Sequence, residues 1–179
     1  MRRDFLPAMQ RLVAVASLPG SALRGQRTSG LTRGIRSALA RLELPLFVQP
    51  TEARFKAALD DANLRLSRTQ GARCKWGVAR KALNLFMRSA AYNHYLREAH
   101  GLERVEAFLE IPLDGIVARH IREGVPSAEL PSWKSMGALT PDLSDRYQAG
   151  ASQLARHRRL DRVHLDAYIW GAERPPAGR

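Results

Sequence analysis

The sequence has little cysteine and few aromatic side chains, and it lacks any long hydrophobic run. The single cysteine, Cys74, excludes an internal disulfide and a zinc site built from several cysteines, and it fits a reducing compartment. No apolar run approaches the roughly 18 residues that a membrane-spanning helix needs. The five histidines show no paired metal-ligand spacing, and neither a Walker A pattern nor a dinucleotide fingerprint occurs. We therefore expect no metal, no cofactor, no membrane segment and a cytoplasmic location.

Acidic residues are the scarcer of the two charged classes. The chain carries 29 basic and 17 acidic residues, which gives a net charge of +12. A positive field of this size attracts polyanions and releases their condensed counterions on binding. The charge indicates a nucleic-acid partner, with DNA favoured, while an anionic membrane surface, an acidic protein or solubility alone remain alternatives.

The positive charge is concentrated in two segments. Residues 1–40 hold seven arginines and one acid, and residues 71–100 hold six basic residues and one acid. Residues 101–130 reverse the balance, with six acids and three arginines. This pattern predicts a basic face built from the N-terminal arm and the 71–100 segment.

The length suits one domain with a real core. We expect a basic, partly flexible arm over residues 1–40, a single helical domain over 41–174 and a tail over 175–179. Within the arm an amphipathic piece, Phe5 to Leu18, precedes a stretch rich in Gly, Ser and Arg. Because the arm is acid-poor, a flexible tail, an ordered helix and a targeting segment all remain possible interpretations.

Helical periodicity dominates the rest, and no alternating run demands a sheet, so we predict a compact all-α fold. Proline, glycine and capping residues set the expected helix limits, with Gly101 ending the longest helix. The expected helices cover 35–42, 52–66 after the Thr51 cap, 76–99, 102–109, 115–123 and 143–157. The last element, 163–170, is either a helix or a short buried strand.

The segment 76–99 has an apolar stripe for the core and a second, polar stripe of Lys81, Asn84 and Arg88. The polar stripe is either a solvated face or a ridge that contacts phosphate. Asn84 favours the second interpretation, because asparagine is a poor helix former that gains nothing on an exposed face.

Asp114 follows Pro112 and precedes the 115–123 helix, where an aspartate commonly caps the free backbone N–H groups. Pro112, Asp114, Val117 and Arg119 together resemble the Pro-Val-Asp-Thr-His-Val-x-Arg stretch of helix-hairpin-helix DNA glycosylases. Gly77-Val78-Ala79-Arg80-Lys81-Ala82 resembles the Gly-Val-Gly-x-Lys-x-Ala hairpin of the same superfamily. Arg-Lys-Ala-Leu-Asn-Leu-Phe (80–86) also resembles stretches of small uncharacterised bacterial helical proteins.

The resemblance implies a hairpin at residues 77–82 whose amides grip a phosphate, with Lys81 as nucleophile at the sugar C1′ and Asp114 assisting expulsion of a damaged base. Ala79 replaces the second glycine, 33 residues separate the two side chains, and no four-cysteine iron–sulfur cluster is present.

The leading hypothesis is therefore a DNA-binding protein. In its more specific version, the protein is a DNA-repair enzyme with a glycosylase/lyase-like site. Lys81 and Asp114 are its candidate catalytic residues, and Trp76 and Trp133 are candidates for stacking on a flipped base. The candidate nucleic-acid-binding residues are Arg73, Lys75, Arg80, Asn84, Arg88 and Arg119. The alternative hypothesis is a non-catalytic helical interaction module of a larger bacterial complex.

Overall fold

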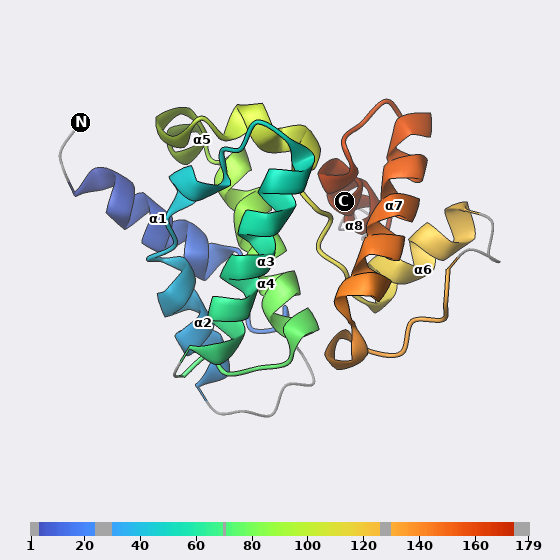
Figure 1. The fold of residues 1–179 in the computed structure, drawn as a ribbon, viewed down its shortest axis with the longest axis horizontal. Coiled ribbons are helices and arrows are strands. Elements are labelled where there is room, and N and C mark those ends of the chain that lie inside the picture. The colour runs from blue at the N-terminus through green and yellow to red at the C-terminus, as the bar shows by residue number, and fades with distance from the viewer. Residues whose placement is uncertain (1–3, 24–29, 70, 126–129, 174–179) are drawn as a thin grey trace, which may run out of the picture.

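The computed structural model describes residues 4–23, 30–69, 71–125 and 130–173, and this part of the chain is all-α (Figure 1). No strand occurs among these residues. The expected fold class is therefore confirmed.

The first half of the chain packs around its own apolar core, in which Phe47, Phe55 and Phe86 are almost fully buried. The central helix, α4, contacts α1, α2, α3 and α5, so the other helices surround it. The elements are α1 (Phe5–Ala16), α2 (Leu31–Leu39), the 3-10 turn η1 (Leu44–Phe47), α3 (Glu52–Arg68), α4 (Trp76–Tyr92), α5 (His94–His100) and η2 (Leu102–Phe108).

The second half forms a smaller core around Ile121, Tyr147 and Leu165. In Figure 1, α6, α7 and α8 lie together on one side of the molecule and α1 to α5 on the other. The elements are α6 (Gly115–Gly124), η4 (Met136–Ala138), α7 (Pro141–His157), η5 (Arg162–His164) and α8 (Leu165–Glu173). One residue of this half, Val163, is buried in the first core.

Several predicted helix limits are confirmed. The Thr51 hydroxyl accepts a hydrogen bond from the backbone N–H of Arg54, and the Asp114 carboxylate accepts from the backbone of Ile116 and Val117. Gly101 ends α5 with a left-handed φ of 67°, a conformation that glycine adopts without strain.

Other limits differ from the prediction. The single helix expected over 76–99 is two, because Asn93 leaves the helical conformation and its side chain caps α5 at the N–H of Leu96. Residues 102–108 are 3-10 rather than α-helical, and the last element is a helix and not a strand.

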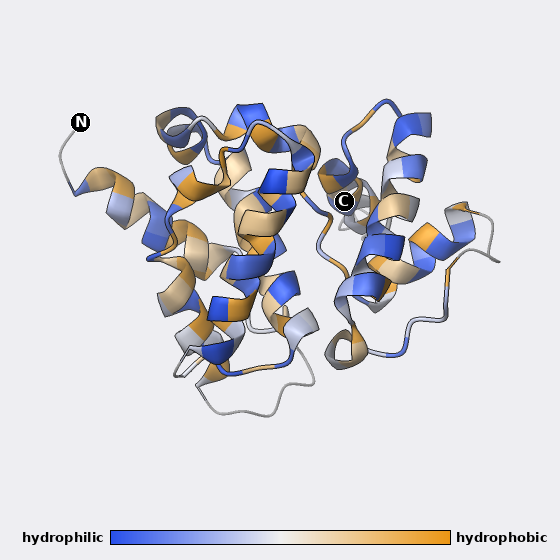
Figure 2. Cartoon of the chain, in the orientation of Figure 1, coloured by the Kyte–Doolittle hydropathy of each residue, from blue (hydrophilic) through white to orange (hydrophobic). Residues whose placement is uncertain are grey.

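The described part of the N-terminal arm belongs to the first core. Val13 and Leu18 are buried there, and so are Ile35 and Leu39 on the inner face of α2. Figure 2 shows apolar and polar stretches on both helices, as expected where one face is buried. The stretch 24–29 and the tail 175–179 lie outside the described residues.

Candidate functional site: the seam between the two cores

The chain crosses from the first core to the second over residues 109–114, and a set of polar contacts accompanies it. We call this set the seam. It joins α3 and α4 of the first half to the crossing segment and to α7, η5 and α8 of the second. Buried charges are costly unless they are paired, so the partners of each charged side chain decide what the seam can do.

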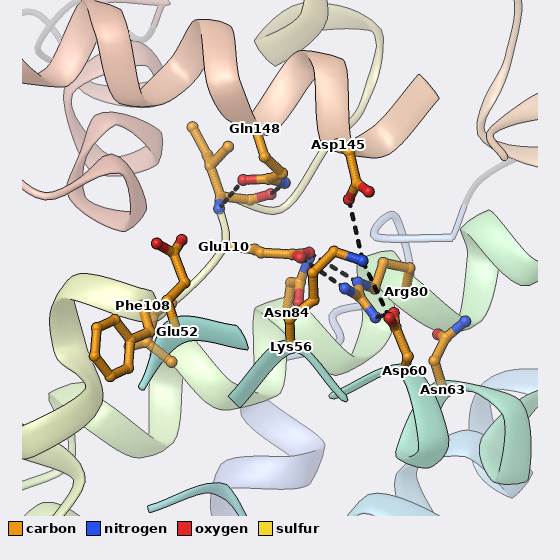
Figure 3. Close-up of polar contacts among 12 residues, drawn as sticks. Glu52, Lys56, Asp60, Asn63, Arg80, Asn84, Phe108, Glu110, Asp145 and Gln148 are labelled. Atoms are coloured by element: carbon orange, nitrogen blue, oxygen red, sulfur yellow. Dashed lines mark hydrogen bonds and ion pairs between the residues drawn. The ribbon is translucent and has the colours of Figure 1, made fainter. Parts of the chain in front are cut away.

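Arg80 lies at the centre of the seam and is only 1% exposed (Figure 3). Its Nε and Nη2 donate to the two carboxylate oxygens of Glu110 at 2.8 and 2.6 Å, and Nη1 donates to Asp60 at 2.7 Å. Burial opposes the charge on Arg80, but Glu110 and Asp60 outweigh it, and the net effect raises the pKa of the guanidinium. Arg80 is a buried cation fixed on three sides.

The neighbouring polar groups complete this network. Asn84 donates from Nδ2 to Glu110 at 2.9 Å, and Lys56 lies 3.1 Å from Asp60 and 3.3 Å from Asp145 of α7. Gln148 of α7 pairs with both backbone groups of Ile111, as Figure 3 shows. Asn84 is therefore buried on a polar partner, which explains why a poor helix former stands in the middle of α4.

Lys81 and Asp114 are in contact, with Nζ and Oδ2 3.1 Å apart. Their side chains are 9% and 17% exposed, so the pair lies just beneath the surface. The other oxygen of Asp114 caps α6. Trp133 lies near Asp114, because a Cβ added to the next residue, Gly115, would be 3.6 Å from the indole Nε1 of Trp133. The structure thus gathers Lys81, Asp114 and Trp133 in one neighbourhood.

The segment 77–82, for which the resemblance implies a hairpin, lies inside α4. Gly77 faces η4, where a Cβ would lie 2.3 Å from the carbonyl oxygen of Met136 and 2.6 Å from Cβ of Leu139. The close approach that this glycine permits is therefore to the chain's own backbone. The first turn of α4 is covered on this side by residues 136–139.

The remaining predicted residues are divided between the interior and the surface. Arg88 forms an ion pair with Asp166 of α8, and the Trp76 ring lies under the Arg80 guanidinium at 5.3 Å. Arg73 and Lys75 are exposed in the connection from α3 to α4, and Arg119 is exposed on α6. Of the six predicted nucleic-acid-binding residues, Arg80 and Asn84 donate hydrogen bonds to Glu110. Arg88 is paired with Asp166.

A group of exposed cations lies at one end of the molecule and was predicted only in part. We call it the basic end: Arg33, Arg68, Arg73, Lys75 and Lys134. Gly34 of α2 and Gly71 approach so closely that a Cβ on Gly34 would lie 1.7 Å from the Gly71 carbonyl oxygen, which brings Arg33 beside the α3–α4 connection. The Lys75 side chain lies against Gly137 near Lys134; a Cβ on that glycine would be 3.2 Å from Cδ of Lys75. No ion pair joins these five cations to an acid among the described residues.

Two more arrangements escaped sequence reasoning. Arg162 donates to the carbonyl oxygens of Phe108 and Leu109 and pairs with Glu52 at 2.8 Å, so it anchors η5 to the crossing segment. Tyr92 and His164 share a hydrogen bond of 2.8 Å although 72 residues separate them. The sequence around these residues does not indicate either contact, because both contacts depend on how the two halves pack against each other.

These features define the class: an all-α protein of two small cores, joined by a seam of paired charges and carrying a basic end. Comparison with protein-family models, with curated proteins and with solved structures finds no match to this chain. Over the described ranges, no helix is long and apolar enough to cross a membrane, and no three His, Cys, Asp or Glu side chains gather as a metal site.

Proposed function

We propose that this protein binds nucleic acid, with DNA as the expected partner, and that the basic end is the contact surface. The observation that carries the proposal is the clustering of five exposed cations from α2, the end of α3, the α3–α4 connection and the segment before η4. No carboxylate is paired with them in the described part of the chain. Such side chains are free to neutralise phosphates and to release counterions.

The contrast with the seam supports this choice of surface. Arg80, Lys81, Arg88 and Arg97 all belong to the basic 71–100 segment, and each is paired with a carboxylate. These four cations therefore stabilise the fold through ion pairs within the protein. Arg73 and Lys75 come from the same segment but are exposed in the α3–α4 connection. We therefore place the contact surface there.

The first test is the salt dependence of binding to a short duplex, followed by fluorescence anisotropy. If all five cations contact phosphates, the slope of log K against log salt is about −4 to −5. An affinity that is indifferent to ionic strength would contradict the proposal.

The second test changes the basic end itself. Arg73→Glu/Lys75→Glu is expected to weaken binding roughly tenfold or more and to make the salt slope shallower by about two. The matched control is Arg11→Glu/Arg54→Glu, which makes the same change in net charge at exposed positions of α1 and of the first turn of α3. Equal losses in both variants would show that overall charge, and not this surface, governs binding.

The contact between Lys81 and Asp114 favours a glycosylase/lyase activity as a second candidate function. A lysine must be neutral and must reach the sugar C1′ to attack it, so the substrate would have to separate the pair. Borohydride trapping on duplex DNA with an abasic or damaged site tests this. Trapping should be lost in Lys81→Ala and kept in Lys56→Ala, which removes a partly exposed lysine outside the basic end. Trapping that persists in Lys81→Ala would remove Lys81 as the nucleophile.

A further inference from the structure

Tyr92, His164 and Glu106 form a chain of contacts at the end of α4 remote from the basic end. The Tyr92 hydroxyl lies 2.8 Å from Nδ1 of His164, and Nε2 of His164 lies 3.4 Å from the carboxylate of Glu106. The three side chains come from α4, η5 and η2, so the docking of the two halves assembles them. The tyrosine and imidazole rings are nearly parallel, with 13° between their planes.

The order of these contacts is that of a nucleophile, its base and a group that orients the base. In the tautomer protonated at Nε2, the nitrogen nearer Glu106, Nδ1 of His164 carries the lone pair that accepts the tyrosine proton. Glu106 is itself held by Arg97, whose Nη2 lies 2.5 Å from Oε2. The imidazole thus lies between the Tyr92 hydroxyl and the Glu106 carboxylate, and Tyr92 itself is 48% exposed.

The groups around Tyr92 favour an anionic centre as the target. Arg88 acts electrostatically on the Tyr92 hydroxyl, and Arg97 donates to the carbonyl oxygen of Ala91, the residue before it. Each guanidinium has five N–H donors and uses only some of them on its carboxylate partner, Asp166 or Glu106. An arginine that acts on the hydroxyl, with a second bound to the backbone of the preceding residue, suits the non-bridging oxygens of a phosphodiester.

We propose that Tyr92 is the nucleophile of a phosphodiester transesterification, with His164 as the general base and Glu106 as the residue that positions His164. The Tyr92 oxygen attacks phosphorus and forms a P–O bond, while the bond from phosphorus to the leaving oxygen breaks. His164 takes the tyrosine proton, and the leaving oxygen takes a proton from water and departs as an alcohol. The product is a phosphotyrosyl ester, and no oxidant or other reactant is required.

Burial raises the pKa of Tyr92, while Arg88 partly offsets this effect. The phenol is thus protonated near neutral pH, and a base in hydrogen-bond contact is what the attack requires. This agrees with the position of His164. The site uses none of the basic end, so the two proposals can fail separately.

The probes are the 5′- and 3′-(4-nitrophenyl phosphate) diesters of thymidine, which test the chemistry without requiring affinity for DNA. We expect a burst of nitrophenolate that does not exceed one equivalent of protein, and a nucleotide adduct on Tyr92 identified by peptide mass spectrometry. Tyr92→Phe keeps the ring and should abolish both signals. Tyr95→Phe is the matched control, because Tyr95 is equally accessible but its ring contacts Phe5 and His94.

The roles of the other two residues have their own measurements. His164→Ala should lower the burst rate at least tenfold, and added imidazole should restore part of it, which a purely structural histidine would not show. Glu106→Gln should lower the rate while the thermal midpoint is followed as a check on folding. The proposal is overturned if neither diester gives a burst and adduct, or if the adduct persists in Tyr92→Phe.

Discussion

Arg80 is the largest of the fully buried side chains, and its position shows how the interior tolerates a charge. Glu110 binds it through two parallel hydrogen bonds, and Asp60 takes a third. A bidentate guanidinium–carboxylate pair fixes distance and direction together. The pair thereby sets the register of α4 against the crossing segment.

Removing one partner of this pair should be costly. Glu110→Ala leaves the Arg80 charge buried with only the half-exposed Asp60, so the free energy of unfolding should fall by about 3–5 kcal/mol. Denaturant titration measures this change. The control is Asp61→Ala, which removes an exposed pair with Arg65 and should cost less than about 1 kcal/mol. Similar losses in the two variants would contradict the importance given to the buried pair.

The Cys74 thiol should react slowly in the folded protein. Burial raises its pKa to about 11 from the ordinary 9.0. The thiolate is the reacting form, and this rise in the pKa lowers the thiolate fraction at pH 8 by roughly 100-fold relative to the unfolded chain. The rate of reaction with Ellman's reagent should fall by the same factor. A folded-state rate equal to that in denaturant would show that the thiol is not shielded.

At the scale of the elements, the contact between α2 and the α3–α4 connection depends on two glycines. Gly34→Ala places a Cβ 1.7 Å from the Gly71 carbonyl oxygen, so one of the two backbones must move. Although alanine favours helices, we expect a loss of about 1–3 kcal/mol from overpacking. Gly171→Ala in α8 is the control, because nothing lies within 4 Å of its Cβ and it should stabilise slightly. Chemical denaturation of both variants checks the expected opposite signs.

The helices could be predicted because their signals are local. Thr51, Gly101 and Asp114 each act on backbone groups within a few residues, and these three predictions are confirmed. The break at Asn93 was missed, because the apolar spacing continues through it while its side chain ends one helix and caps the next.

The site was less predictable than the helices, because its contacts join distant positions. Lys81 and Asp114 were paired by resemblance to a known motif. Arg80 and Asn84 looked equally suited to phosphate, since nothing near them in the sequence announces Glu110, some 26 to 30 residues further on. Charge counts by segment cannot show which cations are already paired.

On the scale of the whole molecule, the two halves are held by charges as well as by apolar contact. Pairs across the seam include Lys56–Asp145, Lys81–Asp114, Arg88–Asp166 and Arg162–Glu52. These pairs connect α3 and α4 to the crossing segment, to α7 and α8, and to η5.

Glu106 of η2 gives the stability of the protein a pH dependence. The hydrogen bond from Arg97 lowers the pKa of Glu106 below its ordinary 4.5. A carboxyl whose pKa is depressed on folding stabilises the protein above that ordinary value, and this stabilisation is lost as the pH falls through the lower, folded value. The free energy of unfolding should therefore decline below about pH 4.5. Glu106→Gln should make the decline shallower, and Glu98→Gln, at a largely exposed position, should not.

The burial of Val163 in the first core has a consequence for how the protein is made. This residue is supplied by η5, long after the other core residues from 13 to 109. A nascent chain on the ribosome cannot close that core until the codon of residue 163 has been read. Translation products that stop short of this position leave the first core incomplete, and quality-control proteases meet them with apolar side chains still uncovered.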